Sequence, residues 1–287
     1  MADKHIDDIS GVETTGHEWD GIRELNNPLP RWWLWTFYAT IVWAIGYVIV
    51  YPAIPMLKDA TRGVINYSSR AELTKEVASA KAAQGALAQK IAASSMDQIL
   101  ADPQLTQFAT AAGAAAFKVN CVPCHGSGAA GGAGYPNLND NDWLWGGSAE
   151  AIHQTIAHGI RSSDDPETRL SEMPAFAEIL KPDQIRQVAA YVISLTDKPH
   201  NPALVEPGKQ VFADNCASCH GENAQGNREF GAPNLADAIW LRVHGEDEIA
   251  KQVQAPKHGV MPAWQARLGE TTVKELAVYV HSLGGGE

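Results

Sequence analysis

The distribution of apolar residues separates one long uncharged run from a more polar remainder of the chain. From Trp32 to Tyr51 no side chain is charged, and the uncharged stretch continues to Leu57. A helix rises about 1.5 Å per residue, so about 20 residues cross a hydrocarbon core about 30 Å thick. Tryptophans open the run and tyrosines close it, as is typical of membrane interfaces. We predict a transmembrane anchor over residues 31–57, with a buried helix of a soluble core as the less favoured alternative.

Polar segments flank this run on both sides. Residues 1–30 contain several glycines and an excess of acidic side chains, so we predict an irregular arm and no cleavable signal peptide. Residues 58–107 are predicted as a spacer, in which residues 69–94 are rich in the helix formers Ala, Lys, Glu and Gln. The apolar residues of this helix form one narrow stripe with a spacing of 3.5 residues. The stripe predicts packing against another subunit, and packing onto the chain's own later domains is the open alternative.

Residues 108–287 contain an internal repeat. Each copy opens with an amphipathic segment that contains a glycine and a phenylalanine, and each copy closes with an amphipathic helix. We predict an all-α protein in which residues 108–199 and 200–287 form two tandem domains, with a short proline-containing linker near residues 197–207. The corresponding positions are Gly113 and Gly208, Phe117 and Phe212, Trp143 and Trp240, Met173 and Met261, and Tyr191 and Tyr279.

Each repeat contains one Cys-x-x-Cys-His motif, at residues 121–125 and 216–220. On a helical turn the two cysteines share a face, so both sulfurs reach the vinyl groups along one porphyrin edge, and the next histidine points at the iron. A thioredoxin-like pair needs no such histidine, and a zinc site needs two further ligands at zinc spacing. We therefore predict two covalently bound haem c groups and class I-like cytochrome c domains. The predicted attachment and proximal residues are Cys121, Cys124, His125, Cys216, Cys219 and His220.

The sixth iron ligand has two candidates at equivalent repeat positions, Met173 and Met261. A thioether raises the reduction potential, and filling both axial positions leaves no place for a substrate, so we expect electron carriers and no catalytic residue. Two alternatives stay open. The methionines could be core packing, and His158 and His258, which also recur in the repeat, could serve as bis-histidine ligands instead. The aromatic residues Trp143, Trp145, Phe176, Trp240 and Trp264 are expected to pack around the haems.

The first repeat differs from the second by an insertion. Between His158 and Met173 the first copy has an additional charged segment, Arg161–Glu172, whereas His258 and Met261 lie close together in the sequence. The segment contains a proline, so we predict a surface loop near the edge of the first haem.

Charge bears on partners and on orientation. Beyond residue 57 there are 19 Lys and Arg side chains against 26 Asp and Glu, so we expect a basic electron donor and no nucleic acid partner. Lysine and arginine counts do not decide how the span is oriented. Haem c is attached on the outer side of bacterial energy-transducing membranes, which predicts residues 1–30 in the cytoplasm and the residues after 57 in the periplasm.

Four further segments make the chain resemble the dihaem subunit, subunit III, of bacterial cbb3-type cytochrome c oxidases. They are WWLW at residues 32–35, GYPNLNDNDWLWGG at 134–147, GIR at 159–161 and MPAF at 173–176. The resemblance covers essentially the whole chain, and the ordered set is far more specific than the haem motifs alone.

The resemblance implies a single-pass protein of the bacterial inner membrane that acts as the electron-transfer subunit of an oxidase. It would accept electrons from a soluble periplasmic cytochrome c or the bc1 complex. It would pass them to a monohaem cytochrome c subunit and the haem–copper catalytic subunit, where oxygen is reduced to water and protons are pumped. Carried over by sequence order, Cys121, Cys124, His125 and Met173 would hold the first haem, and Cys216, Cys219, His220 and Met261 the second.

Two other classes are kept as alternatives. A membrane-anchored dihaem carrier of a periplasmic dehydrogenase would have the same chemistry with a different partner. A dihaem peroxidase would need one iron with a vacant or displaceable site, and the methionine candidate in both repeats argues against it.

Overall fold

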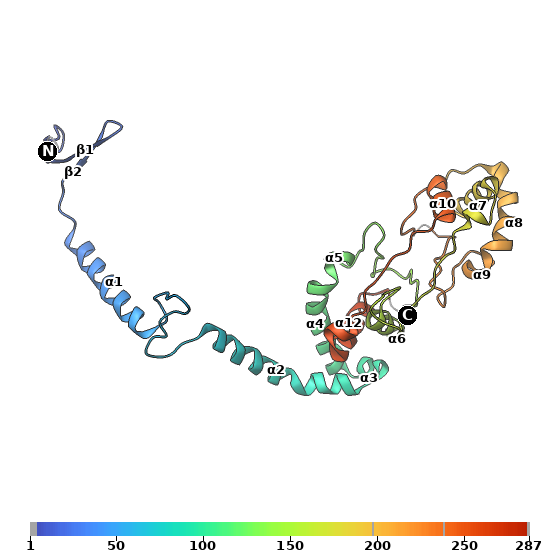
Figure 1. The fold of residues 1–287 in the computed structure, drawn as a ribbon, viewed down its shortest axis with the longest axis horizontal. Helices are drawn as coiled ribbons and strands as arrows, with labels where there is room; N and C mark the ends of the chain where they lie inside the picture. Colours follow the sequence, from blue (N-terminus) through green and yellow to red (C-terminus); the bar gives the residue numbers. More distant parts are fainter. Residues whose placement is uncertain (1–4, 197, 238, 286–287) are drawn as a thin grey trace. The chain divides into compact units, whose positions relative to one another are not determined.

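The computed structural model describes residues 5–196, 198–237 and 239–285. The chain divides into two compact units, one up to Lys81 and one from Ala82 onwards. Helices dominate the described residues, so the predicted all-α class is confirmed, with one small sheet as an addition (Figure 1). The first four positions of the predicted arm and position 197 of the predicted linker lie outside the described residues.

The N-terminal arm contains a β-hairpin, so the prediction of an irregular arm is wrong for this segment. Strands β1 (Thr14–Trp19) and β2 (Ile22–Leu25) pair antiparallel. Asp20 and Gly21 connect them, with φ angles of 49° and 84°. A two-residue turn with both φ angles positive matches the twist of its strands, and Asp-Gly is one of its preferred sequences. The prediction of an irregular arm rested on polar composition and did not take the Asp-Gly turn into account.

Helix α1 (Arg31–Val50) coincides with the predicted anchor. Among the described residues it is the one helix long and apolar enough to cross a membrane, and none of its own residues is buried. A buried core helix would be covered by other elements, so this exposure favours the membrane over the soluble alternative.

A loop closes the C-terminal end of α1. The backbone N–H groups of Val64 and Ile65 donate to the carbonyl oxygens of Ile49 and Val50 at 3.0 and 3.3 Å. The last four carbonyls of a helix have no partner within the helix, so these bonds satisfy groups that would otherwise require water. Gly63 permits the close approach, since its φ is 69° and a Cβ there would overlap the backbone of Val50.

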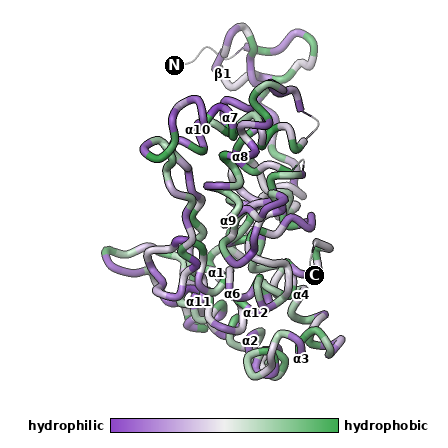
Figure 2. Tube along the Cα trace, turned by 90° about the vertical axis from the view of Figure 1, so that its right-hand side faces the viewer, coloured by the Kyte–Doolittle hydropathy of each residue, from purple (hydrophilic) through white to green (hydrophobic). Residues whose placement is uncertain are grey.

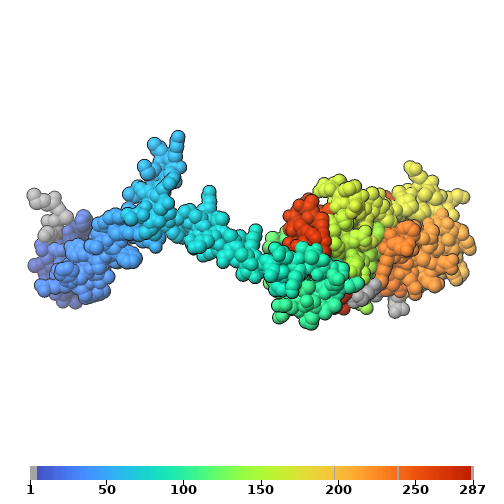
Figure 3. All heavy atoms as spheres, turned by 90° about the horizontal axis from the view of Figure 1, so that it is seen from below, coloured from blue at the N-terminus to red at the C-terminus, as the bar shows by residue number. Residues whose placement is uncertain are grey.

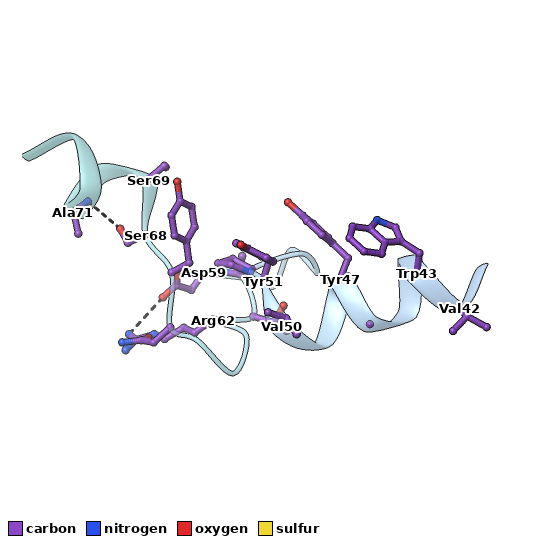
Figure 4. Close-up of a pocket in the computed structure, with 16 residues that line it drawn as sticks. Val42, Trp43, Tyr47, Val50, Tyr51, Asp59, Arg62, Ser68, Ser69 and Ala71 are labelled. Atoms are coloured by element: carbon purple, nitrogen blue, oxygen red, sulfur yellow. Dashed lines mark hydrogen bonds and ion pairs between the residues drawn. The ribbon is translucent and has the colours of Figure 1, made fainter. Parts of the chain in front are cut away.

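Aromatic rings line the side of α1 next to this loop. Figure 4 shows Trp43, Tyr47 and Tyr51 on the helix, with Arg62 and Asp59 on the loop that follows. The rings of Tyr47 and Tyr51 stack with centroids 4.8 Å apart, and Arg62 faces Asp59 at 3.9 Å. Aromatic rings followed by charged groups are typical of the level at which a helix leaves a membrane.

Helix α2 (Ser69–Ala93) corresponds to the predicted spacer helix. Its apolar stripe is divided between two environments. Leu73 and Val77 are 59% and 44% exposed, whereas Ile91 is fully buried and Leu87 packs beside it against the core of the second unit. The alternative of packing onto the chain's own domains therefore holds for the last turns of the helix, within the second unit.

The second unit contains two helical bundles, each with its own hydrophobic core. In Figure 2 hydrophobic and hydrophilic residues are interspersed along their helices, as packing through one face requires. The first bundle consists of α3 (Met96–Ala101), α4 (Pro103–Asn120), α5 (Val122–His125), α6 (Ala149–His158), α11 (Gln265–Leu268) and α12 (Glu270–His281). The second consists of η1 (Phe176–Glu178), α7 (Pro182–Ser194), η2 (Pro202–Leu204), α8 (Val205–Asn215), α9 (Ala217–His220) and α10 (Glu246–Gln254).

The two repeats exchange their C-terminal halves between these bundles. Helix α12, from the end of the second repeat, packs on α4 and α6 of the first, and α7, from the first repeat, packs on α8 and α10 of the second. Figure 1 shows the two long connections that cross from one bundle to the other, and Figure 3 shows the red atoms of the C-terminal helix against green atoms of the first repeat. The boundaries 108–199 and 200–287 therefore describe the sequence repeats, whereas each packed core draws on both.

Glycines make the exchanged helix pairs close. A Cβ at Gly113 of α4 would overlap the backbone carbonyl of Glu275 in α12, and a Cβ at Gly208 of α8 would overlap that of Gln187 in α7. These are the glycines that recur in the repeat. Burying the large side chains around the crossings, such as a phenylalanine in each core, contributes about 1.5–3 kcal/mol per residue.

Candidate functional site

Each Cys-x-x-Cys-His motif forms a single helical turn at the end of a longer helix. In the first copy Cys121 caps the end of α4, and α5 follows it directly. In the second copy Cys216 caps α8, and α9 follows. The backbone N–H of each motif histidine donates to the backbone carbonyl of the first cysteine of the same motif, at 2.9 Å in the first motif and 3.0 Å in the second. This is the local geometry that puts both sulfurs of a motif on one face.

The histidines of both motifs are oriented by backbone carbonyls. Nδ1 of His125 lies 3.1 Å from the carbonyl oxygen of Pro136, and Nδ1 of His220 lies 3.2 Å from that of Pro233. Donation from Nδ1 leaves Nε2 unprotonated, which is the form that binds a metal. Burial lowers the pKa of both histidines below the usual value, although these carbonyls act in the opposite direction, so both rings are kept neutral.

The carbonyl partners come from residues to which sequence analysis assigned no role. Pro136 and Pro233 lie in the repeated segments 134–138 and 231–235, which were recognised only as similar. The recurrence of a proline in these similar segments, 11 residues after His125 and 13 after His220, was the available signal.

The cysteine environment argues against redox chemistry at sulfur. None of the four cysteines forms a disulfide, and Cys124 and Cys219 are exposed. Burial raises the pKa of the Cys121 and Cys216 thiols to about 11, and the neighbouring cysteine in each motif adds to the increase. A thiol–disulfide redox pair requires a lowered thiol pKa instead.

The structure brings each methionine to the motif of the other repeat. Met261 packs against the first core, together with Phe117 and Cys121. Met173 packs against the second core, which contains Phe212 and Cys216. Each methionine therefore packs against the core of the other repeat's motif and not of its own, because the segments that carry the methionines cross between the bundles. The pairing expected from sequence order stays a prediction, and this packing favours the crossed pairing.

The two recurring histidines take other roles. His158 has Nδ1 3.1 Å from a carboxylate oxygen of Asp165 and Nε2 3.4 Å from one of Glu167, so both ring nitrogens face carboxylates of the insertion. Nε2 of His258 accepts a hydrogen bond from the backbone N–H of Met173 at 3.1 Å. These contacts agree with ordinary hydrogen bonding near the site and leave the methionines as the sixth-ligand candidates.

The insertion is not a simple surface loop. Ser162 and Thr168 within it are buried, and the Ser162 backbone N–H donates to the Thr168 hydroxyl at 3.0 Å. The Ser162 hydroxyl in turn accepts from the N–H of Ala263 at 3.3 Å, close to Met261 in the chain. Part of the insertion, including Asp164, is exposed as predicted.

The residues present fit a haem at both motifs. The indole Nε1–H of Trp240 is buried and has no partner among the described residues, so it is a donor positioned for an acceptor such as a propionate. The equivalent Trp143 donates to the backbone carbonyl of Gly285. Trp143 and Trp264 pack against the first core, and Phe176 and Trp240 belong to or contact the second, as expected for residues around a porphyrin.

The loops that orient the two histidines contact each other's repeat. The backbone N–H of Gly134 donates to the carbonyl of Leu241 at 3.0 Å. Gly231 lies so close to the ring of Trp145 that a Cβ there would overlap it. Each loop is thus held by a segment of the other repeat, and both motifs belong to one compact unit.

Comparison with known proteins places this architecture in a family. A family model described as "Cytochrome C oxidase, cbb3-type, subunit III" matches residues 108–192 and 203–280. A second, described as "N-terminal domain of cytochrome oxidase-cbb3, FixP", matches residues 11–58.

Relatives that match along all or nearly all of their length agree. The cbb3-type cytochrome c oxidase subunit FixP of Rhizobium meliloti is 67% identical over 289 residues, covering 100% of both chains. The subunit CcoP of Cereibacter sphaeroides is 53% identical over 276 residues, covering 96% of this chain and 95% of the relative. The subunit FixP of Bradyrhizobium diazoefficiens is 50% identical, covering 98% of each. With the haem motifs, the membrane-length helix and these matches in agreement, the chain belongs to the subunit III family of cbb3-type cytochrome c oxidases.

Proposed function

We propose that this chain is the dihaem electron-transfer subunit of a cbb3-type oxidase, with one haem c attached through the two cysteines of each motif. The main support is that each core combines a histidine oriented by a carbonyl with a methionine from the other repeat. A bound haem supplies reversible one-electron iron chemistry. The residues of the chain anchor and orient that group, and two filled axial positions leave no site for a substrate.

His125 and Met261 would hold the iron of the first haem, and His220 and Met173 that of the second. Each methionine precedes a proline, which stiffens the segment and limits how far the sulfur can move. A thioether favours ferrous iron and so raises the potential of each site, which suits an acceptor of electrons from a cytochrome.

Electrons enter from a basic soluble cytochrome c or the bc1 complex. The excess of acidic over basic side chains beyond residue 57 attracts such a donor. Because each histidine loop contacts a segment of the other repeat, at Leu241 and at Trp145, both sites lie within the second unit, which supports electron transfer between them. It then leaves for the monohaem subunit and the haem–copper subunit, where oxygen is reduced and protons are pumped.

Helix α1 anchors the chain in the bacterial inner membrane, with the arm in the cytoplasm and the haem unit in the periplasm. Its length and the aromatic rings at its end support a single crossing. The exposed Leu73 and Val77 of α2 offer an apolar contact to another subunit.

Purification in mild detergent tests the proposal. The chain should carry two haems that survive denaturation, and it should be accompanied by a subunit with haem b and copper and by oxygen consumption. A stable isolated monomer whose deletion leaves oxidase assembly intact would contradict this function. A co-purifying periplasmic dehydrogenase would favour the carrier alternative, and carbon monoxide binding at one reduced iron would favour the peroxidase.

A further inference from the structure

One arginine contacts both segments that carry the methionines. Nε of Arg161 donates to the backbone carbonyl of Gly259 at 2.7 Å, and Nη1 donates to that of Ser171 at 2.5 Å. Gly259 stands two residues before Met261, and Ser171 stands two residues before Met173. One guanidinium therefore binds both methionine segments at the equivalent position, two residues before the methionine.

The backbone around Arg161 is fixed in the same place. The preceding residue, Ile160, exchanges two backbone hydrogen bonds with Met261, at 2.9 and 3.0 Å. Arg161 has a φ of 52°, in the left-handed region that costs a residue with a side chain about 1–2 kcal/mol. Such a conformation persists only when its surroundings over-determine it. Here the bonds on either side of Arg161 supply that constraint.

The guanidinium is suited to this task because it is partly buried and carries a charge. Burial lowers the pKa of Arg161, Glu172 acts in the opposite direction, and Arg242 adds to the lowering. An arginine nevertheless stays protonated at physiological pH, and a charged donor makes stronger bonds to carbonyls than a neutral one does. Its planar fork reaches two acceptors at once, which the compact ammonium of a lysine does less well.

A second contact links the same two segments in a more restricted way. Nε2 of His258, close to Met261 in the chain, accepts from the N–H of Met173 at 3.1 Å. This bond acts directly on the backbone of one methionine only, whereas Arg161 reaches both segments. The two contacts can therefore be distinguished by experiment.

We infer that Arg161 is a positioning residue shared by the two haem sites, which holds the segments of Met173 and Met261 at the distance from iron that ligation requires. The inference rests on the proposed methionine ligation. Because both segments depend on one side chain, a change at Arg161 alters both sites together. Loss of the Arg161 contacts therefore affects the sixth ligand of both haems.

The experiment compares full-length variants in detergent-solubilised membranes. Met173→His and Met261→His first assign the two steps of a redox titration and the two contributions to the near-red sulfur-to-iron band. Arg161→Leu should then weaken the band at both haems, lower both potentials and admit carbon monoxide to both reduced irons. His258→Leu should act most strongly on the haem assigned to Met173. Arg186→Leu, at an exposed arginine of α7 paired with Asp183, should change neither haem.

A change at one haem only, or at neither, in Arg161→Leu would overturn the shared role. If Arg161→Leu loses its helical circular dichroism signal, Arg161→Lys takes its place. Both reduction potentials should then shift in the same direction by a smaller amount. A shift at one haem only, or at neither, would again overturn the inference. If Met173→His and Met261→His leave the band unchanged, the methionine ligation itself is wrong. That result differs from intact ligation with an unresponsive Arg161 variant.

Discussion

The backbone N–H of Met173 donates to Nε2 of His258 at 3.1 Å, across 85 positions of the sequence. The bond joins the methionine segment of the first repeat to the corresponding segment of the second. It exists because the two segments cross on their way to opposite bundles. The sixth-ligand candidates are therefore mechanically connected, and a substitution in one repeat has consequences for the haem motif of the other.

Crossed ligation predicts which haem each methionine substitution changes. In a chain whose second motif is removed by Cys216→Ser and Cys219→Ser, Met261→His should lower the potential of the remaining haem. A nitrogen donor replaces the soft sulfur there, whereas Met173→His should leave that haem as it was. Redox titration and the near-red band provide the measurement. The opposite result would restore ligation in sequence order.

The recurring glycines predict a stability effect at the helix crossings. Gly113→Ala should destabilise the α4–α12 contact by about 1–3 kcal/mol, because the added Cβ forces the helix backbones apart. Thermal unfolding monitored by circular dichroism measures the change.

Gly85→Ala is the matched control for this substitution. Gly85 also lies within a helix, but a Cβ there meets nothing within 4 Å. This variant should be neutral or stabilised by up to about 1 kcal/mol, since alanine favours helix over glycine. Equal effects of the two substitutions would show that the close approach of α4 and α12 at Gly113 does not contribute to stability.

Glu275 predicts a pH dependence of stability. It is buried in α12, and burial raises its pKa from 4.5 to about 7. The folded state therefore keeps this proton to higher pH than the unfolded state does. The resulting contribution is fully present below pH 4.5 and is lost as the pH rises through about 7, by up to about 3 kcal/mol.

Glu275→Gln should remove this dependence, because glutamine is neutral at every pH. The variant should unfold at a higher temperature than the parent protein at pH 8, and the difference should shrink at pH 5. Glu178→Gln, at an exposed position, should follow the parent protein at both pH values. If the Glu275→Gln variant had the same pH profile of stability as the parent protein, burial would not raise the pKa of this carboxyl.

Electron entry should depend on salt. Acidic side chains outnumber basic ones beyond residue 57, 26 to 19, so association with a basic cytochrome c should be electrostatically assisted. Raising the ionic strength shortens the screening length to about 8 Å at physiological salt, and the second-order rate should fall. Stopped-flow reduction at increasing salt measures it. A flat rate would remove steering without affecting the ligation argument.

Local spacing in the sequence was sufficient for the parts of this protein that depend on local geometry. The helical turn that sets Cys121 and Cys124 on one face is encoded within five residues, and a membrane helix is encoded by the length of an uncharged run. The Asp20–Gly21 hairpin belongs to the same class, since its turn was visible in two residues.

The partner of each half-repeat was decided only by tertiary structure. Gly113 and Gly208 lie on similar helices, and α7 and α12 are similar in turn, so the apolar pattern fits either combination. In the structure α7 packs against α8, which follows it after the short linker around η2, and α12 packs against α4. Short connections favour packing between consecutive helices. The contacts of Arg161 follow from this exchange. They were not predictable from spacing, because a repeat specifies the shape of each interface and not which copy fills it.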